Sequence, residues 1–351
     1  MIAHTLNDAK LFIPTPPPSC PGGSFTQDDV IEELGVTPVR RMNSRGNLAP
    51  HLSLRFDSHI FSIDTSRSPK KCLQPDAYLI THAHSDHYGK SAMLSPMAIA
   101  SEETARALEI RYGREYMGRT CSVGDSISVG DQVVETYPTG HTIGSVAFFW
   151  ENEVGTKTLV TGDVKNHDSL PPCDLLVTEA NYGDPWDPAC RFDDDITAFG
   201  DAVDSGATFG AYAFGKAQRA VALIRGLGYG DEIGMDEQSL ALTQELMPQF
   251  GPFTPAEEND TDINVVTPRN LPRMIGMKYV LTGRKDLPYP RIMLSDHLDF
   301  RGLMRMIEEA SPEATIVYHP EGERANRLAL YLRDQGRGAI SVSEVEKSFY
   351  K

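Results

Sequence analysis

The segment Thr81-His82-Ala83-His84-Ser85-Asp86-His87 follows directly on an apolar run that begins at Ala77. Three histidines and one aspartate fall within six positions, in a chain of 351 residues with 10 histidines in all. Chance would produce such a group with a probability on the order of 10⁻³. Imidazole and carboxylate groups are ligands that divalent ions such as Zn²⁺ prefer, and a turn after a strand can direct alternate side chains at two adjacent ions. The motif therefore predicts a metal site, and surface histidines in a solvated turn are the disfavoured alternative.

Two weaker motifs of the same chemical type follow along the chain. Gly140-His141-Thr142-Ile143-Gly144-Ser145 and Thr161-Gly162-Asp163 each put one candidate ligand in a glycine-containing turn next to an expected strand. Either motif alone is typical of a turn with a satisfied polar side chain. Because they follow the histidine-rich segment in this order, the three motifs are interpreted together rather than as independent observations.

Short apolar and β-branched runs dominate the first half of the chain. They predict strands at 52–56, 59–63, 77–81, 132–137, 145–150, 158–161 and 175–178. One helix, expected at 102–111, interrupts them. From residue 208 strand and helix alternate, with an apolar strand at 208–214 and a helical apolar stripe over 216–227. This organisation predicts an α/β protein in which stacked sheets carry outer helices, followed by a smaller α/β unit.

Composition excludes several classes of protein. The chain holds 49 acidic and 33 basic side chains, a net charge of −16, which excludes a uniformly basic nucleic-acid binder. Hydrophobic residues at 40% and charged residues at 23% exclude a disordered or fibrous chain. The five cysteines include no Cys-x-x-Cys pair, so we expect neither a disulfide framework nor a thiolate zinc site. Because no apolar run is long enough to span a bilayer, the expectation is a cytoplasmic protein without membrane contact.

Three later motifs each follow an expected strand. They are Thr178-Glu179-Ala180-Asn181-Tyr182-Gly183, Leu294-Ser295-Asp296-His297-Leu298-Asp299 and Val317-Tyr318-His319-Pro320. A fourth segment, from Ala211 to Arg219, reads AYAFGKAQR. Together with the histidine-rich, Gly-His and Gly-Asp motifs, they make the chain resemble the metallo-β-lactamase superfamily and, within it, the β-CASP nucleases. The motifs are similar both to the mRNA 3′-end-processing endonuclease of that branch and to its ligase-associated DNA exonuclease.

For the fold, the resemblance implies an αββα sandwich with a metal pair at the sheet edges and a small inserted α/β domain. The expected division is an N-terminal arm at 1–45, a metallo-β-lactamase domain at 46–183 and 291–351, and a β-CASP-like insert at 184–290. The arm looks peripheral, because Pro14 to Pro18 and Pro21-Gly22-Gly23 break any regular element.

The resemblance also assigns roles to single residues. Two groups of metal ligands are implied, bridged by Asp163: His82, His84, His141 and Asp163 for one ion, and Asp86, His87, Asp163 and His319 for the other. The catalytic set is Asp86, His297 and Glu179, in which His297 protonates the leaving oxygen and Glu179 orients it and raises its pKa. The expected cofactor is two Zn²⁺ ions, with Mn²⁺ as the alternative.

Four basic residues are expected to contact the substrate. Lys216 and Arg219 lie where a helix follows Gly215, and the free N–H groups and positive dipole end of a helix start favour a phosphate. Their alternative is an ordinary solvated helix face. Arg284 and Lys285 form a comparable basic turn shortly before His297.

The function indicated is a dinuclear zinc-dependent hydrolase, an endo- or exonuclease acting on RNA or single-stranded DNA in RNA processing or DNA repair. Two alternatives stay open: a non-catalytic β-CASP subunit that binds nucleic acid, and a small-molecule metallo-hydrolase. The expected partner is nucleic acid, and self-association into a homo-oligomer is left open.

The negative charge is unevenly distributed along the chain. Residues 184–204 hold seven acids and one arginine, and residues 231–262 hold nine acids and no Lys or Arg. Residues 269–305, by contrast, hold eight Lys or Arg and three Asp. Because a phosphate responds to the local field rather than to the total charge, these counts predict an acidic outer insert beside a basic stretch that leads to the metal site.

Overall fold

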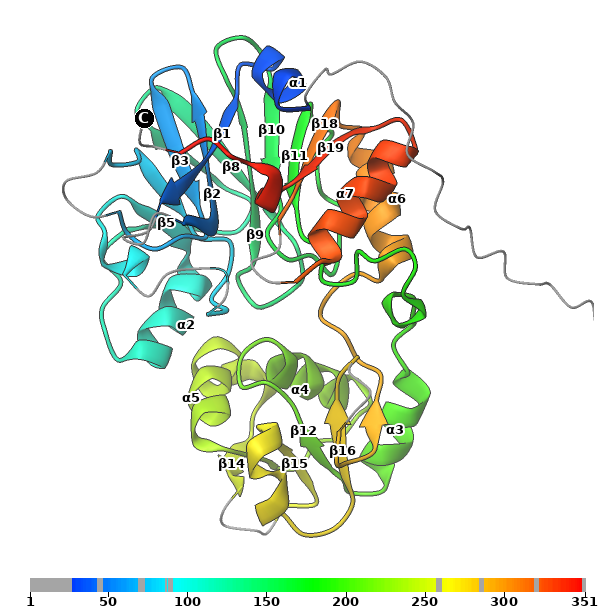
Figure 1. Ribbon diagram of the computed structural model, residues 1–351. Coiled ribbons are helices and arrows are strands. Elements are labelled where there is room, and N and C mark those ends of the chain that lie inside the picture. The colour runs from blue at the N-terminus through cyan, green and yellow to red at the C-terminus, as the bar shows by residue number, and fades with distance from the viewer. Residues whose placement is uncertain are drawn as a thin grey trace, which may run out of the picture.

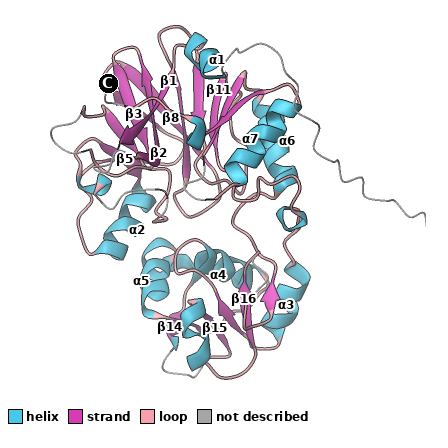
Figure 2. Ribbon diagram, viewed as in Figure 1, coloured by secondary structure: helices cyan, strands magenta, loops and turns pink. Residues whose placement is uncertain are grey.

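Three β-sheets organise the chain in the computed structural model, which describes residues 27–42, 47–68, 73–85, 87, 91–256, 261–283, 287–318 and 322–348. Two sheets lie together in the upper part of Figure 1, and the third forms a separate layer below them. Figure 2 shows helices on the outside of these sheets.

The first sheet has six strands in the order β1-β2-β3-β4-β5-β6. Their bounds are β1 Thr37–Met42, β2 Leu48–Phe56, β3 His59–Ile63, β4 Ala77–Leu79, β5 Ala98–Ser101 and β6 Arg119–Cys121. Strands β1 to β3 pair antiparallel and β3 to β6 pair parallel. Helix α2, Glu102–Tyr112, begins at the N-cap Ser101 and packs Leu108 in one apolar cluster with Tyr78 of β4 and Ala100 of β5.

The second sheet has seven strands in the order β19-β18-β11-β10-β9-β8-β7. Their bounds are β7 Ser126–Val129, β8 Gln132–Pro138, β9 Val146–Glu151, β10 Lys157–Val160, β11 Leu175–Thr178, β18 Ala314–Val317 and β19 Gly338–Ser341. Strands β7 to β10 pair antiparallel, and β10, β11, β18 and β19 pair parallel. Helices α6, Phe300–Ala310, and α7, Arg324–Asp334, cover this sheet, since Leu303 and Leu328 share a buried cluster with Leu176.

The main core lies between these two sheets. Leu52 and Phe61 of the first sheet belong to the same fully buried cluster as Phe148, Trp150 and Leu175 of the second. The layers therefore run helix, sheet, sheet, helix, which confirms the expected α/β sandwich. Alternating apolar residues on both inner faces explain why the two sheets stack rather than form one open sheet.

The third sheet is entirely parallel, in the order β14-β13-β15-β12-β16-β17. Its strands are β12 Thr208–Gly210, β13 Ile233–Met235, β14 Phe253–Pro255, β15 Ile263–Val266, β16 Lys278–Leu281 and β17 Arg291–Ile292. Helices α3 Ile196–Asp204, α4 Lys216–Gly226 and α5 Glu237–Leu246 accompany it around a separate core. Because β11 pairs with β18, the segment that builds this sheet enters and leaves the sandwich between two neighbouring strands.

The remaining helices are short. They are α1 Gln27–Glu33 and the 3-10 turns η1 Ala92–Leu94, η2 Pro188–Cys190, η3 Pro248–Phe250, η5 Pro268–Arg273 and η6 Val342–Glu344. No helix within the described ranges is long and apolar enough to cross a membrane.

The structure differs from the sequence-based expectation near the N-terminus. Ile31 and Val36 are buried in the main core, and β1 pairs with β2 along the edge of the first sheet. Residues 31–42 are therefore part of the sandwich rather than of a peripheral arm, while 1–26 and 43–46 lie outside the described residues. The division into a sandwich domain and an insert at 184–290 stays a prediction.

Candidate metal centre

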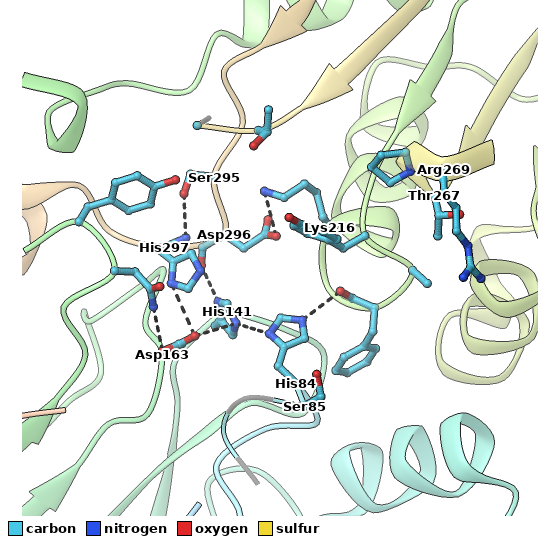
Figure 3. Close-up of a pocket in the computed structure, with 18 of the residues that line it drawn as sticks. His84, Ser85, His141, Asp163, Lys216, Thr267, Arg269, Ser295, Asp296 and His297 are labelled. Carbon is cyan, nitrogen blue, oxygen red and sulfur yellow. Dashed lines mark hydrogen bonds and ion pairs between the residues drawn. The ribbon is translucent and has the colours of Figure 1, made fainter. Parts of the chain in front are cut away.

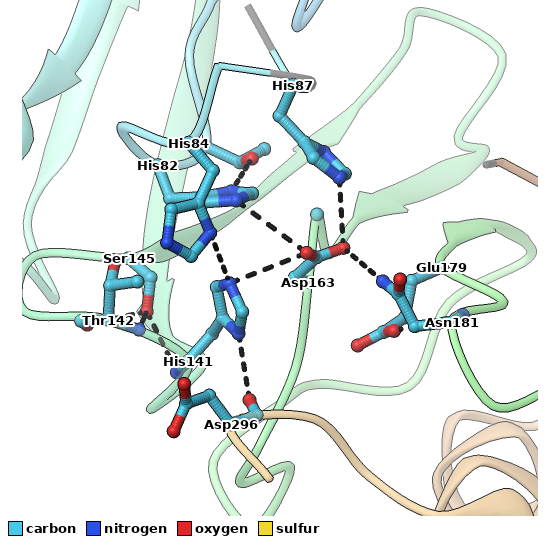
Figure 4. A network of polar contacts seen from close by, with 12 residues as sticks. His82, His84, His87, His141, Thr142, Ser145, Asp163, Glu179, Asn181 and Asp296 are labelled. Carbon is cyan, nitrogen blue, oxygen red and sulfur yellow. Dashed lines mark hydrogen bonds and ion pairs between the residues drawn. The ribbon is translucent and has the colours of Figure 1, made fainter. Parts of the chain in front are cut away.

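The candidate ligands come from loops that follow strands at one edge of the two sheets. His82 and His84 lie just after β4, and Asp64 follows the neighbouring strand β3. His141 lies between β8 and β9, and Asp163 follows β10. Because β3 and β4 are parallel neighbours, the loops after them lie at the same edge of the sheet. Figure 4 shows the side chains of His82, His84, His141 and Asp163 directed at one point.

His82, His84, His141 and Asp163 bring one ligand atom each within 4.8 Å of one another. The Nε2 atoms of His82 and His141 lie 3.7 and 3.4 Å from Asp163 Oδ2. His84 Nδ1 lies 3.0 Å from His141 Nε2. This is the group expected from the sequence for one ion, and a His/Asp cluster suited to a metal is present.

Each imidazole of this cluster is oriented through its other ring nitrogen. His141 Nδ1 donates to the Asp296 carbonyl oxygen at 2.8 Å, and His84 Nε2 donates to the Phe214 carbonyl oxygen at 3.1 Å. His82 Nδ1 lies 3.0 Å from the Thr81 hydroxyl. Such partners fix the ring and leave the inward nitrogen with a lone pair, which is how metal-binding histidines are held.

The donor set fits a divalent ion on two further observations. His82 is fully buried, and its Nε2 has no hydrogen-bond partner among the described residues, an arrangement that a bound cation would relieve. Burial, followed by the charges of neighbouring imidazoles, lowers the pKa of both His82 and His141 well below the usual value. Both rings are therefore neutral at pH 7 and available as ligands.

A second group of ligand atoms adjoins the first and contains Asp64, His82 and His87. His87 is buried, with Nε2 3.2 Å from Asp163 Oδ1 and Nδ1 3.4 Å from Asp64 Oδ2. The structure thus brings His87 next to Asp163, and a metal-ligand role for His87 stays a prediction. Asp86 and His319, the other predicted ligands of that ion, lie outside the described residues.

Asp64 was not predicted. Its carboxylate accepts hydrogen bonds from the Thr81 N–H at 2.8 Å and the Thr81 hydroxyl at 2.7 Å, so it holds the start of the histidine-rich loop. Its φ of 44° is in the left-handed region, which aspartate tolerates better than most residues. The available signal was an aspartate directly after an apolar strand, which is too common to single out one residue.

His297 and Glu179 form a pair next to Asp163 and His141. His297 Nδ1 lies 3.1 Å from Glu179 Oε2 and 3.7 Å from Asp163 Oδ2. Burial opposes charge on the ring, but Glu179 and Asp163 outweigh it and raise the pKa of His297. The Val164 N–H donates to Glu179 Oε1 at 2.7 Å, which fixes the carboxylate. The structure therefore brings together the two residues that the sequence placed 118 positions apart.

A cavity of ≈ 1090 Å³ opens over this cluster. His84, His141, Asp163 and His297 line one part of it, and residues of the third-sheet region, such as Thr267 and Arg269, line another, as Figure 3 shows in close-up. Four cations and two carboxylates occur in the described lining: Arg111, Lys216, Arg269, Arg324, Asp163 and Asp296. The wall is thus locally less acidic than the chain as a whole, and it is large enough for an extended ligand.

Two of the basic residues predicted to contact the substrate make hydrogen bonds and ion pairs with other groups of the protein. Lys216 is buried, with Nζ 2.8 Å from the Leu294 carbonyl oxygen and 3.2 Å from Asp296 Oδ2. Arg219 contacts Asp296 Oδ1 at 3.4 Å and Asp194 Oδ2 at 2.6 Å. Lys216 lines the cavity and Arg219 does not. A substrate contact stays a prediction for Lys216, and Arg219 has a structural role that its sequence context did not indicate.

The other two predicted contacts, Arg284 and Lys285, lie outside the described residues.

Asp194 is the centre of this ion network. It accepts from Lys165 Nζ at 2.7 Å, from Arg219, and from the Ser295 N–H at 2.8 Å, so it joins the loop after β10, helix α4 and the segment before His297. Asp194→Asn is expected to lower the free energy of unfolding by about 2 kcal/mol, less than for a fully buried pair because the partners are partly hydrated. Urea denaturation measures this.

Asp193→Asn is the matched control. Asp193 also pairs with an arginine, Arg301, at 2.9 Å, but its side chain is 89% exposed. An exposed pair contributes little, so this variant should unfold like the wild type. Equal destabilisation by the two variants would contradict the role assigned to Asp194.

Comparisons with known proteins give a distant sequence relative and a similar fold. No protein-family model matches it. A protein from Opitutus terrae, named as a probable DNA ligase, is 25% identical over 338 residues, which cover 86% of this chain and 31% of that protein. The chain therefore spans about a third of the length of this curated relative. A crystal structure of a protein of unknown function from Enterococcus faecalis V583 has a TM-score of 0.56 and 14% identity, covering 81% of this chain and 93% of that one, and it supports the fold alone.

Proposed function

We propose that this protein is a dinuclear metal-dependent hydrolase that cleaves phosphodiester bonds of nucleic acid, with Zn²⁺ as the expected ion. The observation that carries the proposal is the set of four imidazoles around Asp163, each with one nitrogen anchored and the other directed inwards. The name of the Opitutus relative, a probable DNA ligase, supports nucleic acid as the class of substrate. The size of the cavity favours an extended substrate over a small metabolite.

His82, His84, His141 and Asp163 would hold one ion, and His87 and Asp163 would contribute to the second together with Asp86 and His319. When bound, such a pair of ions neutralises charge on a phosphodiester and lowers the pKa of a water molecule to near neutral. Asp163 would contribute to both ions, since its two oxygens face different histidines. The geometry suits this role, because Oδ2 faces His82 and His141 while Oδ1 faces His87.

His297 would hold the proton that the leaving oxygen needs. Its Nδ1 is engaged by Glu179, so Nε2 is the nitrogen left for the substrate. The side chain is 21% exposed and lines the cavity, so a phosphodiester at the metal centre can reach it. Asn181 donates to Asp163 Oδ1 at 3.2 Å and keeps the bridging carboxylate in place.

The test begins with metal-free protein. We expect no hydrolysis of labelled oligonucleotides after chelation, and full recovery when two equivalents of Zn²⁺ or Mn²⁺ are added. Single-stranded RNA and DNA of one sequence, each with a 5′-phosphate or a 5′-hydroxyl, identify the preferred polymer, and the product ladder separates an endonuclease from an exonuclease. Protein that binds two ions per chain and hydrolyses neither polymer would contradict the proposal. Fewer than two ions per chain would favour a subunit that only binds nucleic acid.

A further inference from the structure

A second recess, of ≈ 410 Å³, adjoins the cavity on the side of the third sheet. It is lined by residues at the start of α5 and along η5: Asp236, Glu237, Gln238, Thr267, Arg269, Asn270 and Arg273. Three of them, Gln238, Thr267 and Arg269, also line the main cavity. A ligand that fills the cavity can therefore extend into the recess, although no residue of the recess belongs to the metal centre.

Asp236 builds the frame of this recess. Its Oδ2 accepts hydrogen bonds from the Thr267 N–H and hydroxyl, both at 2.6 Å, and from Asn270 Nδ2 at 2.9 Å. Its Oδ1 accepts from the Ser239 N–H at 3.2 Å as the N-cap of α5. The Asp236 carboxylate thus connects η5 to the start of α5 through hydrogen bonds. Because protein donors already bind both of its oxygens, its negative charge is partly neutralised.

Arg269 and Arg273 are the two cations that this frame presents. Both are exposed, and within the described residues neither makes an ion pair, a hydrogen bond or a ring contact. Arginines nearer the metal centre are used differently, since Arg219 pairs with Asp194 and Arg324 with Asp187. Figure 3 shows Arg269 across the cavity from Asp163 and His297. Glu237, which is exposed, is the other carboxylate of the recess, so the two guanidinium groups outnumber the one carboxylate whose charge no described donor takes up, and they favour an anion locally.

Tyr212 provides the third element of the argument. It lines the main cavity, and its side chain is 54% exposed. An exposed aromatic ring in a cavity that also holds cations is the arrangement on which unpaired bases stack. A base within a duplex cannot stack on it, because its faces are already covered by the neighbouring bases.

We infer that a single nucleic-acid strand, with one phosphate at the metal centre, passes Tyr212 and places a flanking phosphate in the recess on Arg269 and Arg273. This inference rests on the proposed function, because it takes the metal centre as the position of the scissile bond. The inference goes further than the proposed function in giving the path of the strand across the third-sheet region and the residues that bind it. The phosphate is recognised by charge-assisted hydrogen bonds from the guanidinium groups, which carry no base preference.

The experiment measures binding with chelator present, so that it does not depend on hydrolysis. The probes are fluorescein-labelled single-stranded DNAs of two and twelve nucleotides, followed by anisotropy at several salt concentrations. For R269Q/R273Q we expect an affinity for the twelve-nucleotide probe about 25-fold lower at 0.1 M salt, and a salt dependence shallower by about 1.4 in log–log slope, the values for two phosphate contacts on a single strand. The loss for the dinucleotide should be much smaller, because it cannot span the cavity and the recess.

R55Q/R305Q is the matched control. Arg55 on β2 and Arg305 on α6 are exposed and, in the part of the chain that the structure describes, unpaired, and neither lines the cavity or the recess. This variant removes the same charge and should bind the long probe like the wild type. Equal losses in the two double variants would overturn the inference, as would an equal loss for both probes with R269Q/R273Q.

Tyr212→Ala should weaken the long probe about fivefold or more, and Tyr212→Phe should retain its affinity, because only the ring face is needed. Equal affinities for these two variants would overturn the stacking role. The wild-type protein can also bind the long probe through the arginines and yet hydrolyse no oligonucleotide after metal is restored. That result would contradict the proposed function but not the binding surface.

Discussion

Asp163→Asn is expected to abolish oligonucleotide hydrolysis, with a loss on the order of 10³-fold or more, because in the proposed centre both metal positions share this carboxylate. Asp163 is only 3% exposed and lies within 3.7 Å of nitrogens of His82, His87 and His141. Asparagine has nearly the same shape but removes the negative charge and replaces one of the two acceptor oxygens by an NH₂ group, which cannot bind a cation. Metal content per chain should fall together with activity.

The Asp163→Asn variant should still fold. The gain in thermal stability on adding metal distinguishes an aspartate that binds metal from one that only stabilises the fold. Metal that binds only the native state stabilises it, by about 2.7 kcal/mol at a hundredfold excess over its dissociation constant. We expect wild-type protein to gain thermal stability when Zn²⁺ is added and the variant to gain little, while the two metal-free proteins melt alike. Asp174→Asn is the control, since Asp174 accepts a hydrogen bond, as Asp163 does from Asn181, but lies outside the site; its donor is the Lys157 N–H at 2.7 Å. A variant that kept two ions and normal turnover would exclude Asp163 as the bridge.

The site could be predicted from the sequence where several ligands share a short segment. His82, His84 and His87 fall within one loop, so their spacing alone was informative. Asp64 was missed because it lies in a separate segment and acts through Thr81 and His87. Contacts of this kind depend on which strands become neighbours, here β3 and β4, and single-sequence patterns do not contain that information.

The strand β1 shows the same limit for the fold. Thr37-Pro38-Val39-Arg40-Arg41-Met42 carries two arginines and a proline, which are unfavourable signals for a strand. In the structure it is an edge strand, where such residues are tolerated, and Arg40 donates from Nε to the Ala49 carbonyl oxygen at 2.7 Å. Pairing with the next strand, β2, thus overrode a weak local propensity.

The acidic run at 184–204 was read as part of an acidic outer surface, and the structure shows several of its members in ion pairs. Asp184 contacts Arg327 at 2.6 Å and Asp193 contacts Arg301 at 2.9 Å, in addition to the contacts of Asp194. Counting charges along the chain cannot show this, because each partner lies more than a hundred positions away or in another element. The basic stretch at 269–305 is likewise divided, with Arg269 on the cavity wall and Arg301 bound to Asp193 and Asp299.

His297→Asn is expected to lower kcat for an oligonucleotide by about 10²- to 10⁴-fold, the range for loss of a general acid. The same ring is close enough to Asp163 and Glu179 to be a metal ligand, so metal content and leaving group must be compared. A general acid matters little when p-nitrophenolate leaves, because this anion departs without a proton. We therefore expect unchanged metal content and a much smaller loss on a p-nitrophenyl phosphodiester. Equal losses on both substrates with reduced metal content would make His297 a ligand instead.

Glu179→Gln tests the same assignment through pH. Glu179 raises the pKa of His297 against the opposing effect of burial, so removal of its charge should lower that pKa. An acid must be protonated to act, and the rate falls as pH rises through its pKa. The alkaline limb of the kcat profile should therefore move to lower pH in the variant, while the two enzymes converge at acidic pH, where His297 is protonated in both. Glu309→Gln breaks a comparable carboxylate–imidazole pair, with His167 at 3.0 Å, and should leave the limb in place. A limb that stays fixed or moves to higher pH in Glu179→Gln would show that His297 is not the group whose protonation limits turnover.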